Sequence, residues 1–189
     1  GGACLDADGL VPTFPDATYW LQRQQWDWAH HPSERDRGSY RLEDFEPLQA
    51  AGCLKLVDGQ SEILPGVRVI PVSGHTPGQQ IVEFHIDEGV LVFLADFIPT
   101  LAHVHLPWIA GFDLNPLLTL SEKREFLSRA VAERYMLVFQ HDAAHEACRV
   151  EFVDDRRIDV GVPLQEASRT DDVLQHVGDP GARREQPLG

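Results

Sequence analysis

Three loop positions in the sequence carry side chains of the kinds that bind metal ions. They are His75 within Gly-His-Thr-Pro-Gly, Asp96 after Leu-Ala, and His141 after Phe-Gln. Each follows a run of apolar residues that predicts a strand, so each side chain would be held at the edge of a sheet. Neutral imidazole combined with carboxylate suits zinc, iron or manganese. The sequence therefore raises the hypothesis of a metal site built from these three residues.

Taken singly, each signal has an ordinary alternative, because a lone histidine after a strand is more often a loop residue than a ligand. Their order is more informative. A Gly-His-Thr-Pro-Gly turn, an apolar strand ending in Leu-Ala-Asp about twenty residues later, then a helix and a strand ending in His, resembles the metallo-β-lactamase-fold superfamily. The resemblance extends from Gly1 to about Phe152. It implies an α/β fold, the metallo-β-lactamase-like αββα sandwich.

The resemblance also implies particular roles for the three residues. His75 would be the last ligand of one metal ion and His141 the last ligand of a second, with Asp96 as the catalytic carboxylate that bridges both. Two divalent ions, zinc with manganese or iron as alternatives, would turn a water molecule into the attacking hydroxide. The complete protein would then hydrolyse a small-molecule ester, lactone, thioester or related bond. The segment 100–116 most resembles the lactonase-like branch of the superfamily.

The superfamily takes its remaining metal ligands from a His-x-His-x-Asp-His motif, which many members follow with Ala-Gly-Gly. This sequence begins Gly1-Gly2, so we expect that motif and the first strands of the fold immediately upstream. No substitute occurs within the chain, because His103-Val104-His105 has the His-x-His spacing but not the Asp and His that should follow. The alternative hypothesis is a truncated, non-catalytic half that binds metal weakly or only packs against another chain.

The segment after Asp96 is the candidate wall of a substrate pocket. His103, Trp108 and Phe112 would line this pocket beside the metals, with plain packing as the alternative role. Gln79 stands where many members of the superfamily have a second histidine, so the proton-handling role of that position is not expected here.

The composition limits the partners of the chain. Sixteen Lys and Arg against thirty Asp and Glu give a formal net charge of -14 at pH 7, which repels phosphate backbones and anionic membranes and disfavours a nuclease. No apolar run approaches the roughly 18 residues of a membrane span. The three cysteines indicate neither a disulfide framework nor a zinc knuckle. We therefore expect a cytoplasmic protein with a small-molecule substrate and without nucleic-acid or membrane partners, and a homo-oligomer is left open.

Periodicity and turn residues predict one domain over 1–160, which opens with a loop through Gly9, and a flexible tail over 161–189. A helix should begin with Asn115 as N-cap and Pro116 at its first position, and should reach about residue 134. Its one apolar face should carry Leu117, Leu120, Leu127 and Val131. The other expected elements are strands at 17–21, 54–57, 67–72, 80–86, 90–95, 136–139 and 148–152, and helices at 22–29 and 43–51.

Overall fold

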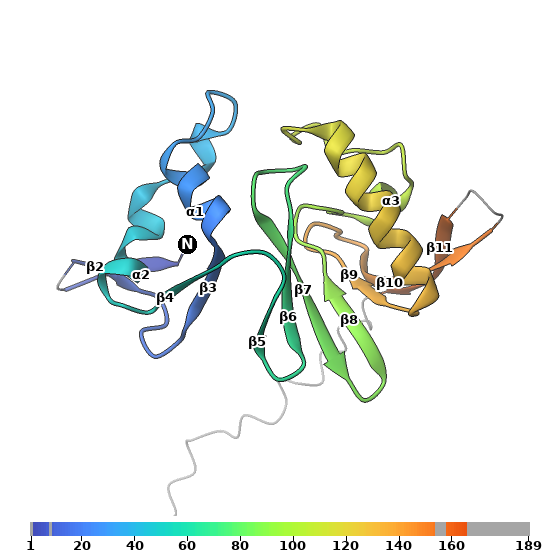
Figure 1. Ribbon diagram of the computed structural model, residues 1–189, viewed down its shortest axis with the longest axis horizontal. Helices are drawn as coiled ribbons and strands as arrows, with labels where there is room; N and C mark the ends of the chain where they lie inside the picture. Colours follow the sequence, from blue (N-terminus) through green and yellow to red (C-terminus); the bar gives the residue numbers. More distant parts are fainter. Residues whose placement is uncertain (1, 8, 154–157, 166–189) are drawn as a thin grey trace, which may run out of the picture.

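The computed structural model describes residues 2–7, 9–153 and 158–165, and its largest element is a seven-stranded sheet (Figure 1). The strand order is β11-β10-β9-β8-β7-β6-β5, and every neighbouring pair is antiparallel except β8 with β9, which are parallel. The strands are β5 (Ser61–Leu64), β6 (Val67–Val72), β7 (Gln79–Ile86), β8 (Gly89–Phe93), β9 (Met136–Val138), β10 (His145–Phe152) and β11 (Ile158–Gln165).

The parallel pair β8 and β9 requires a long crossover, because two parallel strands cannot be joined by a tight turn. The chain makes this crossover through the short 3₁₀ helix η3 (Leu101–Val104) and the helix α3 (Pro116–Ala132), which lies across one face of the sheet (Figure 1). As a result the carboxyl ends of β8 and β9 meet at the same edge. Asp96 follows β8 and His141 follows β9 at that edge.

Helix α3 confirms its predicted start and part of its predicted apolar face, because Leu127 is buried in the core and Val131 packs against it. The Asn115 side chain accepts a hydrogen bond from the Leu118 N–H at 3.1 Å, and Pro116 occupies the first turn. Leu117, expected on the apolar face, is 78% exposed. The first turn of α3 packs a polar surface against loops rather than against the sheet, so the prediction that Leu117 lies on the apolar face is wrong. The buried residues of α3 are Thr119, Lys123, Phe126, Leu127 and Ala130.

The N-terminal part of the chain forms two small sheets with helices beside them (Figure 1). Residues through Gly9 were expected to form a loop, but they form half of an antiparallel hairpin in which Asp6 pairs with Gly9. The second small sheet is the parallel pair of strands that flanks the first helix. The elements are β1 (Ala3–Asp6), β2 (Gly9–Pro12), β3 (Tyr19–Gln22), α1 (Arg23–His30), η1 (Arg37–Ser39), η2 (Leu42–Asp44), α2 (Glu46–Ala50) and β4 (Leu54–Val57).

Amide side chains join the β3–β4 pair to the large sheet. Gln22 is 2% exposed, and its Nε2 donates to the Gln80 Oε1 at 3.3 Å and to the Gly59 carbonyl at 3.1 Å. Gln80 in turn donates from Nε2 to the Trp20 carbonyl at 3.1 Å. Buried polar groups that are satisfied in this way fix one arrangement of the two sheets. Helix α1 and the segment after it are thereby held beside the turn between β6 and β7.

Most of the expected elements are confirmed to within a few residues, and β4 and β6 have the predicted bounds. Strands β5 and β11 were not predicted. Strand β11 continues past residue 160, where the tail was expected to begin, and residues 166–189 lie outside the described part of the chain. The expectation of a tail over those residues therefore stays a prediction.

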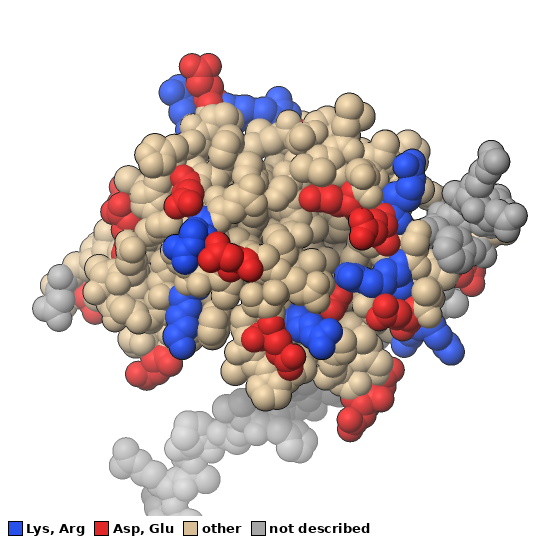
Figure 2. All heavy atoms as spheres, viewed as in Figure 1, with Lys and Arg blue, Asp and Glu red and all other residues tan. Residues whose placement is uncertain are grey.

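The surface carries charges of both signs, and acidic and basic side chains are interspersed over the face in Figure 2. Within the described residues, no helix is both long enough and apolar enough to cross a bilayer. The predictions about nucleic acid and membranes are otherwise untested.

The close approach of Gly74 to α3 gives a first prediction. A Cβ added at Gly74 would lie 2.2 Å from the Thr119 Oγ1 and 2.4 Å from the Thr119 backbone nitrogen. Because backbone cannot move aside cheaply, Gly74→Ala should lower the free energy of unfolding by about 1–3 kcal/mol. Chemical denaturation measures this change. The control is Gly38→Ala, where a Cβ would meet nothing within 4 Å. Equal stabilities for the two variants would contradict the close packing.

Candidate active site

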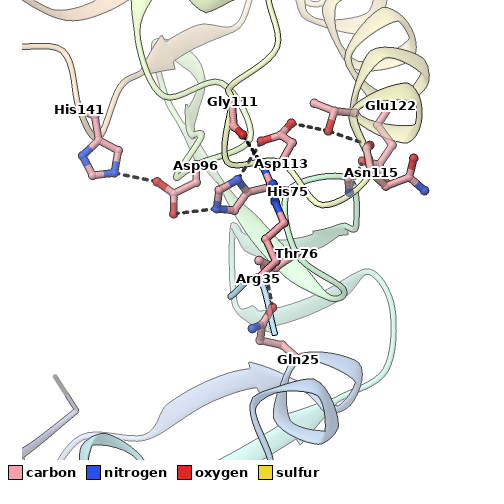
Figure 3. A network of polar contacts seen from close by, with 12 residues as sticks. Gln25, Arg35, His75, Thr76, Asp96, Gly111, Asp113, Asn115, Glu122 and His141 are labelled. Carbon is pink, nitrogen blue, oxygen red and sulfur yellow. Dashed lines mark hydrogen bonds and ion pairs between the residues drawn. The ribbon is translucent and has the colours of Figure 1, made fainter. Parts of the chain in front are cut away.

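Asp96 lies between two histidines at the edge where β8 and β9 end (Figure 3). Its Oδ1 is 2.7 Å from the His141 Nε2, and its Oδ2 is 3.7 Å from the His75 Nε2. The side chain of His75 is 18% exposed, that of Asp96 36% and that of His141 52%. The structure therefore brings together the three residues that the sequence singled out, with one carboxylate oxygen facing each imidazole.

The backbone before Asp96 is held in an unusual conformation. Ala95 has a φ of +48°, in the left-handed region that residues with a Cβ seldom adopt. The preceding Leu94 is fully buried, and its N–H donates to the Val138 carbonyl on β9 at 3.1 Å. Strain of this kind persists where the surrounding structure enforces it, and it is common at functional sites. The turn at Ala95 directs the Asp96 side chain away from the sheet and toward the histidines.

His75 is oriented from behind by a buried carboxylate. Its Nδ1 is 2.9 Å from the Asp113 Oδ1, and Asp113 also accepts a hydrogen bond of 2.6 Å from the Thr119 hydroxyl. The hydrogen bond to Asp113 raises the pKa of His75 above its usual value, opposed by partial burial and supported by the nearby charge of Asp96. With Nδ1–H donated to Asp113, the Nε2 lone pair faces Asp96. Metal-binding histidines commonly show this carboxylate–histidine arrangement.

The loop that carries His75 is attached to helix α3. Glu122 accepts hydrogen bonds from the Ser73 N–H at 2.8 Å and the Gly74 N–H at 3.0 Å, and burial raises the pKa of this carboxyl. In two further main-chain hydrogen bonds the loop of His75 is the acceptor. The Leu114 N–H donates to the His75 carbonyl, and the Asn115 N–H donates to the Gly74 carbonyl. The position of His75 is therefore set by α3 as well as by the sheet.

The loop that carries His141 is tied to the chain that leaves Asp96. The His141 N–H donates to the Pro99 carbonyl at 3.0 Å, and the Leu101 N–H donates to the Asp142 Oδ2 at 2.9 Å. Burial raises the pKa of Asp142, but hydrogen bonds from Leu101, Ala144 and His145 outweigh it, so the pKa lies below its usual value. The ionised Asp142, which directly follows His141, thus anchors this loop to Leu101.

A cavity of about 820 Å³ opens beside His75 and Asp96. Its size is within the range of about 300–1,000 Å³ that is typical of small-molecule sites. The predicted Phe112 lines it, whereas His103 and Trp108 are not among its lining residues. The opposite wall comes from the segment after α1, where the Arg35 Nη2 donates to the Gly111 carbonyl at 2.5 Å (Figure 3).

Polar side chains also line this cavity, among them Gln25 and Tyr40, which the sequence did not single out, and Gln79. Gln25 donates to the Tyr40 hydroxyl at 2.9 Å and accepts from the Thr76 hydroxyl at 3.1 Å, which ties α1 to the loop of His75. Gln79 lines the cavity too, and its Oε1 is buried without a hydrogen-bond partner in the described part of the chain. The cavity therefore offers polar groups beside the apolar Phe112.

The donor set fits part of a metal site in type and orientation. Two Nε2 atoms face one carboxylate, and the second nitrogen of His75 is already occupied by Asp113. Within residues 2–7, 9–153 and 158–165, however, no group of three or more His, Cys, Asp or Glu side chains is arranged to hold an ion. A metal would therefore need further donors in addition to these three residues.

The supporting residues Asp113, Thr119, Glu122 and Lys123 were missed from the sequence. A signal for three of them is present, because Thr119, Glu122 and Lys123 fall at spacings of three and four on a helix and interrupt an otherwise apolar face. Asp113 had no such signal, since its contact with His75 joins residues 38 positions apart.

Comparison with known proteins gives relatives of one kind. An N-acyl homoserine lactonase from Bacillus thuringiensis is 31% identical over 150 residues, which cover 77% of this chain and 56% of the relative. One from Bacillus cereus is 30% identical over 133 residues, covering 65% of this chain and 52% of the relative. The chain thus spans about half the length of the curated relatives it matches. No family model matches the sequence.

Solved structures with a similar fold include a probable metal-dependent hydrolase from Staphylococcus aureus, with a TM-score of 0.73 and 22% identity over 85% of this chain and 56% of that one. The dizinc quorum-quenching lactonase AidC, in complex with N-hexanoyl-L-homoserine, has a TM-score of 0.64 and 17% identity. The match covers 82% of this chain and 57% of the AidC chain. A hydrolase of the β-lactamase superfamily, AbOPH, has a TM-score of 0.68 and 18% identity. The match covers 82% of this chain and 57% of the AbOPH chain. These likenesses confirm the α/β fold expected from the sequence.

The contact between His75 and Asp113 predicts a dependence of stability on pH. Since the folded-state pKa of His75 is raised, the stabilisation is fully present below the unfolded pKa of about 6.5 and is lost as pH rises through the folded-state pKa. The difference in unfolding free energy between wild type and His75→Gln, measured with a chelator present, should therefore shrink from about pH 6 to pH 9. His31→Gln, at an exposed histidine, is the control. A difference that stays constant over this range would refute the pairing.

Proposed function

Since the chain is homologous to N-acyl homoserine lactonases and has the metallo-β-lactamase fold, we propose that its residues contribute to the active site of a metal-dependent hydrolase for a small-molecule lactone or ester. The observation that carries the proposal is the position of Asp96, whose two oxygens face the Nε2 atoms of His75 and His141. A carboxylate in that position can be shared between two neighbouring ions.

In this proposal two divalent ions, zinc with manganese or iron as alternatives, supply a water nucleophile of lowered pKa and polarise the scissile carbonyl when they are bound. The residues of the chain do the rest. Asp96 would be shared by both ions, His75 would hold one and His141 the other. Asp113 keeps the His75 ring in the tautomer whose Nε2 is free, and the main-chain hydrogen bond to Pro99 fixes the loop of His141.

The substrate would occupy the cavity beside His75 and Asp96. Phe112 offers an apolar contact at its mouth, and Tyr40 and Gln79 offer polar contacts. A lactone is the preferred substrate class because the curated relatives are lactonases. Thioesters and related bonds fit the same chemistry. Direct substrate contacts by His103 and Trp108 remain predictions, as does a cytoplasmic location, and a homo-oligomer stays open.

A second candidate function is a non-catalytic role in which the chain binds metal weakly or only packs against another chain. The number of donors favours it, because in the described part of the chain His75, Asp96 and His141 do not complete a site for any one ion. Zinc sites ordinarily need at least three protein ligands. The superfamily resemblance leads us to expect further ligands in a His-x-His-x-Asp-His motif. Their presence would favour the hydrolase over the non-catalytic role.

Metal loading separates the two candidates. The 189-residue chain alone should bind zinc or manganese at well below two ions per chain and hydrolyse a lactone slowly or not at all. Addition of a segment that carries the expected motif should raise both quantities together. Metal content by elemental analysis and lactone hydrolysis, before and after metal is added, measure this. Two ions per chain with turnover of about 1 to 10³ per second for the chain alone would contradict the need for further ligands.

In any form of the protein that turns over substrate, Asp96→Asn should cost more activity than Gln79→Ala. The lost charge at Asp96 would disturb both ions, whereas Gln79 faces only the cavity. We expect a loss in kcat/KM of at least about 100-fold for the first variant and about 10-fold or less for the second. Both variants must be compared at equal metal content. Comparable losses would remove the special role of Asp96.

A further inference from the structure

Lys123 is a fully buried lysine in the middle of α3, with 1% of its surface exposed. Its ammonium donates to three main-chain carbonyls, those of His103 at 2.6 Å, His105 at 2.7 Å and Trp108 at 2.8 Å. An ammonium has three N–H donors and no acceptor, so three carbonyls satisfy it completely. Burial lowers the pKa of Lys123 to about 8, opposed by the charge of Asp113. The lysine therefore still carries its proton at neutral pH.

The carbonyls belong to residues 99–113, which we name the bridging segment because it connects the surroundings of both histidines. At one end the Pro99 carbonyl accepts from the His141 N–H. At the other end Asp113 accepts a hydrogen bond from His75, and the nearby Gly111 lines the cavity. A shift of this segment would therefore move the supports of both rings that face Asp96.

Lys123 ties the middle of the bridging segment to another element. The N–H groups of His103 and Trp108 donate within the segment itself, to Thr100 and His105. The three bonds from Lys123 instead cross from the segment to α3, the helix whose Glu122 also binds the loop of His75 and whose Thr119 donates to Asp113. One helix thus supports the His75 loop through Glu122, the end of the bridging segment through Thr119, which donates to Asp113, and the middle of that segment through Lys123.

We propose that Lys123 is a positioning residue for this site, which fixes the bridging segment through three carbonyls and so keeps Asp113 against His75 and His75 at its distance from Asp96. A purely structural lysine would stabilise the fold as a whole. A positioning lysine makes the order of the bridging segment, and the hydrogen bond between His75 and Asp113, depend on its side chain. The inference rests on the proposed function only where activity is concerned.

The test compares Lys123→Met with Lys55→Met in the full chain. These are the only two lysines of the sequence, and Lys55 is exposed. Backbone hydrogen exchange and the NMR signal of the His75 Nδ1 proton are recorded without metal or substrate. For Lys123→Met, amides of the bridging segment should exchange at least about tenfold faster while β6 and β8 change little, and the His75 proton signal should broaden or vanish. Lys55→Met should change neither.

The proposal is overturned if Lys123→Met leaves the segment and the His75 signal as in wild type, or if exchange rises equally throughout the chain. Should Lys123→Met not fold, Lys123→Arg takes its place, because a planar guanidinium keeps the charge but cannot direct one donor at each of the three carbonyls. In a form that hydrolyses substrate, Lys123→Met should lower kcat/KM about tenfold, mainly through kcat, with Lys55→Met unchanged. If the protein hydrolyses no substrate even when a segment with the expected motif is added, the proposed function fails, while the exchange experiment still decides the role of Lys123.

Discussion

The parallel pairing of β8 with β9 is the constraint on which the candidate site depends. Because the two strands run in the same direction, the residues that follow them emerge at one edge, and Asp96 and His141 come within 2.7 Å of each other. The same pairing requires a crossover, and the crossover supplies α3 and the bridging segment. The antiparallel β6–β7 turn then adds His75 from a third direction. The parallel pairing thus places Asp96, His141 and the helix that supports the site, and the β6–β7 turn places His75.

Helix α3 serves the site through polar residues on a face that packs against the protein. Thr119 donates to Asp113 at the end of the bridging segment, and Glu122 accepts from the turn of His75. Lys123 donates to carbonyls in the middle of the bridging segment. Buried polar groups of this kind are costly unless every partner is present, and here the partners are main-chain atoms and one carboxylate. Such a face stabilises one arrangement of the loops rather than a larger apolar core. That arrangement is what a shared carboxylate between two imidazoles requires.

The sequence predicted the convergence of the three candidate ligands better than the contacts that support them. His75, Asp96 and His141 were found because each is marked locally by an apolar strand followed by a polar residue, and the structure brings them together. Asp113 acts through a contact set by the tertiary crossover, which no local pattern reports, and the helical spacing that marks Lys123 does not identify the carbonyls it binds. Strands β1, β2 and β5 were missed because each is only four residues long and has few buried side chains to mark it. The error at the start of α3 arose because leucine was assumed to be buried wherever helical spacing allowed it.

The central claim is that one carboxylate, Asp96, is shared by two metal ions, one beside His75 and one beside His141. Metal content tests it most directly, in whichever form of the protein loads two ions. The account predicts that His75→Ala and His141→Ala each lose tight binding of one ion, whereas Asp96→Asn weakens the binding of both. Retention of two tightly bound ions by Asp96→Asn, or loss of only one, would contradict it.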